Sequence, residues 1–275
     1  MDVERLVARH YAQGGLEAAI LAGLAAAGKD PARLGMDDLA PVDEFHIGGR
    51  RATEELAARL PLAPGMKLLD IGSGLGGAAR FLATRHGCDV TGIDLTAEYV
   101  AVANMLAARV GLAGRVRYLE GSAMALPFAD ASFDGATMLH VGMNIADKGA
   151  LFRGVRRVLK PGGFFAIYDV MAEDGGGDLA YPVPWATTAA TSFVERAASY
   201  RAWLAESGFV VTHERNRRDL AMEFFARLRA AGANGPPPLG LHLVMGEATR
   251  AKVANMIGNV ERGLVAPVEI VARAE

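Results

Sequence analysis

The stretch from Met66 to Leu95 constrains the fold more than any other part of the chain. It runs MKLLDIGSGLGGAARFLATRHGCDVTGIDL, in which an apolar strand leads through a glycine-rich turn into a helix and then into a second strand. Glycines lack a Cβ atom, so the turn can bend tightly and its backbone can approach a ligand closely. The spacing from Gly72 to Asp94 is that of nucleotide-binding units, in which the acid accepts hydrogen bonds from the ribose. The stretch therefore predicts a nucleoside site.

The glycines alone leave the cofactor open. Gly72, Gly74 and Gly77 satisfy the G-x-G-x-x-G pattern, which is also found in proteins that bind nicotinamide or flavin cofactors. Asp70, however, places a carboxylate two residues before the first glycine. There it would repel a pyrophosphate but attract an ammonium or a sulfonium. This turn is therefore interpreted as a site for S-adenosylmethionine, which carries both cationic groups.

Downstream of this unit the pattern alternates between apolar strands and amphipathic helices. Strands are predicted over residues 116–120, 133–141 and 164–171, and helices over residues 96–110 and 147–159. Such alternation is typical of a parallel sheet with helices on both faces, where ligands bind at the carboxyl ends of the strands. The polar residues predicted at those ends are Asp70, Asp94, Ser122, His140 and Asp169.

The two ends of the chain depart from this alternation and suggest how the chain is organised. We expect an N-terminal helical lid over residues 1–50, a Rossmann-like domain over residues 51–275, a lid or substrate loop at about 173–195 and a helical insertion at about 218–262. Tyr11 is the one aromatic residue in the first helical segment. It is either a packing ring or a phenol that closes over the substrate.

Composition narrows the class of partner. The formal net charge of -2 gives no general attraction to nucleic acid or to an anionic membrane, so a small-molecule partner is expected. Cys88 is the single cysteine, which excludes an internal disulfide and a thiolate metal site, and no cluster of acids suggests an oxygen-ligated metal. The N-terminus lacks the apolar core of a signal peptide, and no stretch is apolar enough to cross a bilayer. A cytoplasmic protein is expected, with its oligomeric state left open.

The motifs LLDIGSGLGG, GIDL, GSAMALPF, SFDGATMLH and RVLKPGG follow one another at predicted strand ends. In this order, over about residues 45–172, the chain resembles the class I S-adenosylmethionine-dependent methyltransferases. FHIGG and HVGMNIADK are similar to the small-molecule branch that contains sarcosine and dimethylglycine N-methyltransferases, phosphoethanolamine methyltransferases and sugar O-methyltransferases. The resemblance implies an α/β fold, a Rossmann-like, seven-stranded, mostly parallel and doubly wound sheet with an antiparallel last strand.

The resemblance also implies a set of residues that hold the methyl donor. The glycine turn would hold the methionine part, Asp94 the ribose and Leu95 one face of the adenine. Ser122 stands where an aspartate is common in the family. The predicted cofactor site comprises His46, Asp70, Gly72, Gly74, Asp94, Leu95, Ser122, Ala123, Met124 and Leu139.

Three residues are predicted to serve catalysis. In phosphobase relatives a tyrosine near the N-terminus pairs with the histidine after strand four, which here would be Tyr11 with His140. Those relatives carry an acid four residues before that histidine, where this chain has Ala136. A hydroxyl acceptor needs a general base, for which His140 is the best-placed residue, backed by Asp169, whereas an amine needs only to be neutral. A His140 that merely caps the strand end is the alternative.

The predicted function is transfer of a methyl group from S-adenosylmethionine to a nitrogen or oxygen of a small molecule, with S-adenosylhomocysteine as the product. Two alternatives remain. In the first, the fold retains the cofactor but catalyses another reaction, such as a cyclisation. In the second, the glycine pattern belongs to a nicotinamide oxidoreductase.

Overall fold

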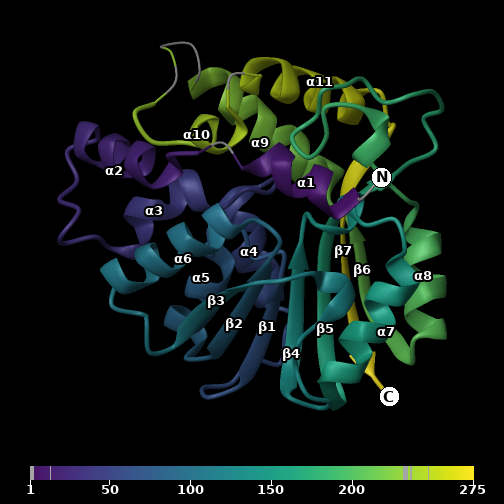
Figure 1. Ribbon diagram of the computed structural model, residues 1–275. Coiled ribbons are helices and arrows are strands. Elements are labelled where there is room, and N and C mark those ends of the chain that lie inside the picture. The colour runs from purple at the N-terminus through teal and green to yellow at the C-terminus, as the bar shows by residue number, and fades with distance from the viewer. Residues whose placement is uncertain (1–2, 13, 232–234, 236, 247) are drawn as a thin grey trace.

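The computed structural model describes residues 3–12, 14–231, 235, 237–246 and 248–275. These residues contain a seven-stranded sheet in the order β3-β2-β1-β4-β5-β7-β6 (Figure 1). Neighbouring strands pair in parallel, except that β7 runs antiparallel to both β5 and β6. The predicted fold class, with its antiparallel last strand, is therefore confirmed. The strands are β1 (Lys67–Ile71), β2 (Asp89–Asp94), β3 (Val116–Glu120), β4 (Phe133–Leu139), β5 (Leu159–Ala172), β6 (Phe209–Asn216) and β7 (Val265–Ala274).

Helices cover both faces of this sheet and its carboxyl edge. Leu56 of α4 and Phe81 of α5 belong to the apolar cluster on one face, and Phe152 of α7 and Leu204 of α8 to the cluster on the other. The helices are α1 (Val3–Tyr11), α2 (Leu16–Ala26), α3 (Met36–Asp43), α4 (Gly49–Ala57), α5 (Gly77–His86), α6 (Ala97–Arg109), α7 (Lys148–Val158), α8 (Ala197–Glu206), α9 (Arg218–Ala231), α10 (His242–Met245) and α11 (Thr249–Glu261).

Strand β5 explains why the centre of the sheet reads as a continuous apolar run. Phe165 and Ile167 point into the cluster beneath α7, whereas Phe164 and Tyr168 point into the cluster beneath α5. Alternate residues of a strand face opposite sides, and here both sides are covered by helices. Successive positions from Phe164 to Tyr168 are therefore apolar, because both faces of the strand pack against helices.

Residues 36–43, within the range expected for the N-terminal helical lid, form α3, although Pro41 within it removes a backbone donor. Strand β5 departs from its predicted range because it begins at Leu159 instead of residue 164, and its pairing with β4 shifts register before Phe164. Gly14 and Gly15 separate α1 from α2, and both glycines adopt a φ of 75°.

Helix α1 lies over the carboxyl ends of the strands, below the layer formed by α9, α10 and α11 (Figure 1). The connection between α1 and α2 is tied to α6 at these glycines, because the Glu98 carboxylate accepts hydrogen bonds from the backbone of Gly14 and Leu16. Among the described residues, no helix is both long and apolar enough to cross a membrane. Residues 1–2 and 13 of the expected lid, and residues 232–234, 236 and 247 of the expected insertion, lie outside the described part of the chain.

Candidate functional site

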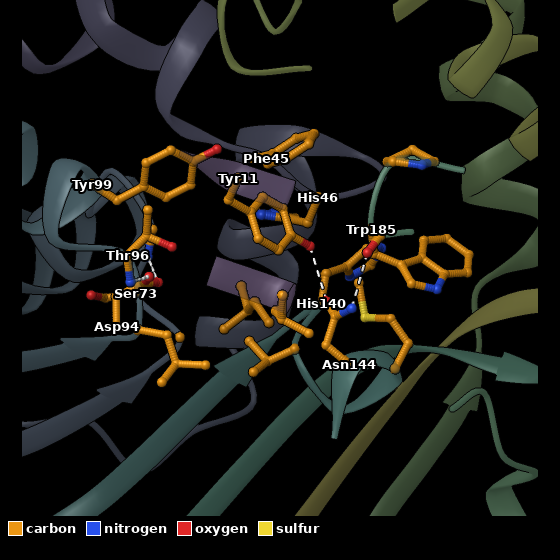
Figure 2. Close-up of a pocket in the computed structure, with 18 of the residues that line it drawn as sticks. Tyr11, Phe45, His46, Ser73, Asp94, Thr96, Tyr99, His140, Asn144 and Trp185 are labelled. Carbon is orange, nitrogen blue, oxygen red and sulfur yellow. Dashed lines mark hydrogen bonds between the residues drawn. The ribbon is translucent and has the colours of Figure 1, made fainter. Parts of the chain in front are cut away.

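A cavity of about 420 Å³ lies at the carboxyl edge of the sheet, under α1 and under the α9–α11 layer (Figure 2). Its volume is within the range of small-molecule sites. Ser122 and Asp169, which were predicted to face the ligand, are not among the described residues that line the cavity. The predicted site residues that line it are Tyr11, His46, Asp70, Gly72, Gly74, Asp94, Leu95, Ala123, Met124, Leu139 and His140.

The glycine turn forms the floor of one end of this cavity. Gly72 has a φ of 64°, and a Cβ atom there would lie 2.4 Å from Cγ2 of Val141. Glycine is therefore required by both its backbone conformation and its neighbour. Gly74 also has a left-handed φ, and its N–H donates to Oδ2 of Asp94 over 2.8 Å. The turn after β1 and the end of β2 are thus locked together, as the predicted strand-helix-strand unit requires.

Two carboxylates flank the turn. Asp94 also accepts a hydrogen bond from the backbone of Thr96, over 2.9 Å, and burial raises the pKa of Asp94 above its ordinary value. The hydroxyl of Thr137 donates to Asp70 over 2.7 Å. Burial, with smaller contributions from the neighbouring Glu44 and Asp94, raises the pKa of Asp70 to about 7. A cationic group beside Asp70 would stabilise its charged form and lower this pKa.

Two buried hydroxyls in the cavity wall have no hydrogen-bond partner among the described residues. They belong to Ser73 and Tyr99. Buried polar groups are almost always satisfied, so unpaired ones beside a cavity indicate a polar ligand. Together with Asp70 and Asp94 they fit S-adenosylmethionine, which has a sulfonium, an ammonium and two ribose hydroxyls to pair.

The end of the cavity predicted for adenine differs from expectation. Ser122 does not itself face the cavity: its hydroxyl donates to the carboxylate of Glu4 and accepts from the backbone of Met124. Glu4, near the start of α1, lines the cavity instead. Sequence reasoning missed Glu4 because nothing local distinguishes an acid in the first turn of a helix from an ordinary charge that favours the helix dipole.

His140 lines the cavity just after β4, but its neighbours are not the predicted ones. Its Nδ1–H donates to the carbonyl of Tyr168 over 3.2 Å, and its Nε2 accepts from the backbone N–H of Ile47 over 3.3 Å. Burial first, and the nearby His46 second, lower the pKa of His140 to about 3. Its φ of 56° is uncommon for a residue other than glycine and is of the kind found at functional sites.

The expected contacts of His140 with Tyr11 and Asp169 are therefore corrected. The phenol of Tyr11 donates to Oδ1 of Asn144 over 3.0 Å, as Figure 2 shows. Asp169 is fully buried and accepts a hydrogen bond from Tyr200 of α8 over 2.6 Å. Its side chain therefore points toward α8 and away from the cavity. Asn144 was not singled out, although it ends the LHVGMN segment. A catalytic role for each of the three predicted residues stays a prediction.

His46, predicted as part of the cofactor site, lies in the same wall. Its Nε2–H donates to the carbonyl of Gly49 over 3.1 Å and lies 3.0 Å from the hydroxyl of Thr53, which in turn donates to Glu44. Burial lowers the pKa of His46 to about 4, so its ring is neutral near pH 7. The rings of His46 and His140 are 5.9 Å apart. Two neutral imidazoles thus border the middle of the cavity (Figure 2).

The other end of the cavity is apolar. The described lining contains no lysine or arginine, and its charged members are the acids Glu4, Asp43, Asp70, Asp94 and Asp147. Trp185 comes from the irregular segment that the sequence identified as a substrate loop. The apolar residues of this end are Phe45, Ile47, Trp185, Phe224, Phe225, Leu228, Leu241, Met245, Val253 and Met256.

Part of the chain matches a known family. Residues 69–167 match the family described as Methyltransferase domain. An O-methyltransferase of Aspergillus sclerotiorum is 36% identical over 134 residues, which cover 49% of this chain and 51% of that protein. Erythromycin 3''-O-methyltransferase of Saccharopolyspora erythraea is 33% identical over 196 residues, covering 64% and 62%. The chain thus aligns with about half to two thirds of the length of these relatives.

Solved structures agree on the fold. Geranyl diphosphate C-methyltransferase of Streptomyces coelicolor A3(2), solved with S-adenosyl-L-homocysteine, superposes with a TM-score of 0.73 at 19% identity and covers 100% of this chain and 98% of that one. The predicted cofactor, S-adenosylmethionine, is the methyl donor of the matched family, and this prediction is confirmed. Over residues 69–167 the chain therefore matches the methyltransferase domain family, and its fold is that of the solved methyltransferase.

Proposed function

We propose that the protein transfers a methyl group from S-adenosylmethionine to a hydroxyl oxygen of a neutral, largely apolar small molecule. One observation carries the proposal. A single cavity has Asp70 and Asp94 beside a glycine turn at one end and an apolar wall without a lysine or arginine, among the described residues, at the other. The first end suits a cationic nucleoside, and the second suits an uncharged acceptor.

When bound, the donor supplies an electrophilic methyl group on a positively charged sulfur. Asp70 is placed to attract a cationic group beside the turn, and Asp94 to accept hydrogen bonds from the ribose hydroxyls while it holds the turn through Gly74. These residues hold the donor. Catalysis then depends on how the methyl group of the donor and the oxygen of the acceptor are oriented. Holding the two reacting groups in line can supply about 7 to 11 kcal/mol of the barrier at the upper end.

The apolar wall supports a neutral acceptor. A phosphate or carboxylate of the acceptor would have no cationic side chain to pair with among the described lining residues, and burying an unpaired anion is costly. Apolar surface, by contrast, gains about 25 cal/mol per Å² on burial. Phosphobases and amino acids are therefore disfavoured. The two O-methyltransferase relatives support oxygen over nitrogen as the methylated atom.

For a hydroxyl acceptor, His140 is the residue we assign to take the proton. Its pKa of about 3 keeps Nε2 unprotonated near pH 7, and the long contact with Ile47 N–H is readily exchanged for an acceptor O–H. A base this weak does not remove the proton in advance. It takes the proton as the oxygen–methyl bond forms, when positive charge on that oxygen makes the proton acidic.

Residues 1–50 and the segment at about 173–195 are proposed to close over both ligands. Asn144 supports this assignment because it contacts both segments: it accepts from Tyr11 and donates to the carbonyls of Trp185 and Thr191, each over 3.0 Å. Closure of this kind excludes water and completes the site.

Two measurements test the proposal. Calorimetry should detect binding of S-adenosylhomocysteine and none of NAD. Incubation with the methyl donor and a panel of acceptors should give mass gain and S-adenosylhomocysteine with apolar alcohols or phenols, and not with phosphoethanolamine or sarcosine. Methylation of the phosphobase alone would contradict the assigned acceptor class. Conversion of an acceptor without S-adenosylhomocysteine would instead support the cyclisation alternative.

A further inference from the structure

Ser122 raises a question that the proposed function leaves unanswered. In the family an aspartate commonly stands at this position beside the adenine, and its carboxylate is a natural acceptor for the exocyclic amine. This chain has a hydroxyl there, and the hydroxyl does not line the cavity. Something else must accept the hydrogen bonds of that amine if adenine is to be distinguished from other bases.

The hydrogen bonds of Ser122 show where its proton goes. The hydroxyl has one proton, which it donates to Oε1 of Glu4, and it accepts a hydrogen bond from Met124 N–H. Only one lone pair remains on that oxygen. Among the described residues, no hydrogen bond uses the second carboxylate oxygen of Glu4, Oε2. The pair therefore presents a carboxylate at this end of the cavity, delivered by a residue that is distant in sequence.

The position of Glu4 agrees with such a role. Glu4 lines the cavity together with Leu95, Ala123 and Met124, the residues assigned to the adenine on the side of the sheet. Tyr11, two turns further along the same helix, lines the cavity as well. At 1.5 Å per residue, α1 extends about 10 Å between these two side chains, so that one helix contacts both the nucleoside end and the middle of the site.

We propose that Glu4 supplies the carboxylate that accepts a hydrogen bond from the exocyclic amine of the donor's adenine, with Ser122 holding that carboxylate in place. The inference rests on the proposed binding of S-adenosylmethionine and deepens it. It makes base recognition dependent on docking of α1. A donor that lacked the amine would leave one oxygen of the partly buried Glu4 carboxylate without a hydrogen-bond donor.

The competing interpretation is that Glu4 and Ser122 only latch α1 to the sheet. The two interpretations differ in base selectivity. A latch strengthens binding of every nucleoside that the closed site accepts, whereas a carboxylate that reads the amine discriminates against a base with a carbonyl oxygen at that position. S-Inosylhomocysteine has this carbonyl in place of the amine and a proton on the neighbouring ring nitrogen N1, and otherwise it matches S-adenosylhomocysteine.

The experiment is calorimetry of both compounds with the full chain. The wild type should prefer S-adenosylhomocysteine by about 10- to 100-fold, the range for one hydrogen bond to a charged group. Glu4→Ala should lose most of this preference, and Glu4→Gln should reduce it because an amide can also donate to the carbonyl. Glu17→Gln, an equal change of charge at an exposed acid in α2, is the matched control and should keep the preference.

A rescue variant distinguishes loss of adenine recognition from a general disturbance of folding. Glu4→Ala combined with Ser122→Asp returns a carboxylate to the same place from the other side, and should restore the preference for adenine. An unchanged preference in Glu4→Ala would overturn the inference, while binding of S-adenosylhomocysteine to the wild type would keep the proposed function. Absence of that binding in the wild type would overturn both.

Discussion

The phenol of Tyr11 donates to the side-chain oxygen of Asn144 across 133 positions of sequence. The amide of Asn144 is itself held by the carbonyls of Trp185 and Thr191. One buried side chain therefore joins α1, the turn after β4 and the irregular segment before α8. The segments that cover the site are therefore hydrogen-bonded to one another, and a substitution in one of them should change how firmly the others are docked.

Tyr11→Phe tests this coupling, because it keeps the ring that packs against Phe45 and Tyr99 and removes only the hydroxyl. Loss of one hydrogen bond should weaken docking of α1 by about 0.5 to 1.5 kcal/mol. Hydrogen exchange with S-adenosylhomocysteine present should show reduced protection in residues 3–12. Tyr181→Phe in the irregular segment is the control. Equal protection in wild type and Tyr11→Phe would show that the phenol does not hold the helix.

His140→Ala should lower turnover of a hydroxyl acceptor by about 10²- to 10⁴-fold, the range for loss of a general base, while S-adenosylhomocysteine affinity stays nearly constant. Because the pKa of His140 is about 3, its protonation should cause no loss of activity between pH 5 and 8. Single-turnover rates across this range measure both effects. His46→Ala is the comparison for a neighbouring neutral imidazole. Turnover near the wild-type level in His140→Ala would remove the residue from the chemistry.

Because the pKa of Asp70 is raised, we expect binding of the donor to release a proton. Without a ligand its pKa of about 7 leaves it mostly protonated at pH 6, and a nearby sulfonium or ammonium lowers that pKa. Binding of S-adenosylmethionine at pH 6 should therefore release close to one proton, and affinity should rise as pH increases toward 7. Calorimetry in buffers of different ionisation enthalpy counts the proton.

The raised pKa of Asp70 also predicts how the stability of the free protein changes with pH. Its pKa is raised on folding, so the free protein should lose stability as pH rises from about 4 to about 7, in the range where the folded chain holds a proton that the unfolded chain has released. Asp70→Asn should abolish the proton release and reduce this slope, while Asp169, whose pKa burial raises to about 6, keeps its own contribution to the slope. Persistence of the release in Asp70→Asn would assign it to a different group.

Leu228 offers a test of the apolar acceptor wall. It lines the cavity and is 40% exposed, whereas Val210 on β6 is 41% exposed and lies outside the cavity lining. Leu228→Ala should raise KM for an apolar acceptor by up to about 10-fold, because part of a leucine's burial energy of about 1.5 to 3 kcal/mol is lost. Val210→Ala should leave KM unchanged. Equal KM values in both variants would place the acceptor elsewhere.

Local sequence signals predicted the frame of the site well. The strand, glycine turn and helix around Gly72 follow from short-range rules of backbone geometry, and the alternation of elements led to the sheet and its carboxyl edge. Asp70 and Asp94 could be placed because each is fixed by its own strand. A helical lid was expected over residues 1–50, but α3 within it was not delimited, and its Pro41 shows that tertiary contacts override a local preference.

The contacts between distant segments could not be predicted in the same way. Tyr11 meets Asn144 and Glu4 meets Ser122 only because α1 folds back over the sheet, and no pattern within α1 fixes where it docks. Asp169 was expected to support His140, since both lie near the carboxyl ends of neighbouring strands. Side chains alternate along β5, so Asp169 shares the face of Phe165 and Ile167 and turns toward Tyr200.

Binding of S-adenosylhomocysteine to the wild type and to Asp94→Ala, followed by calorimetry, tests the central claim most directly. The wild type should bind, and Asp94→Ala should bind more weakly by about 1.5 to 3 kcal/mol, the cost of losing hydrogen bonds to a charged acceptor. Asp89→Ala, at the exposed amino end of the same strand, is the control and should bind as the wild type does. Failure of the wild type to bind, or an equal affinity in Asp94→Ala, would contradict the assignment of this cavity to the methyl donor.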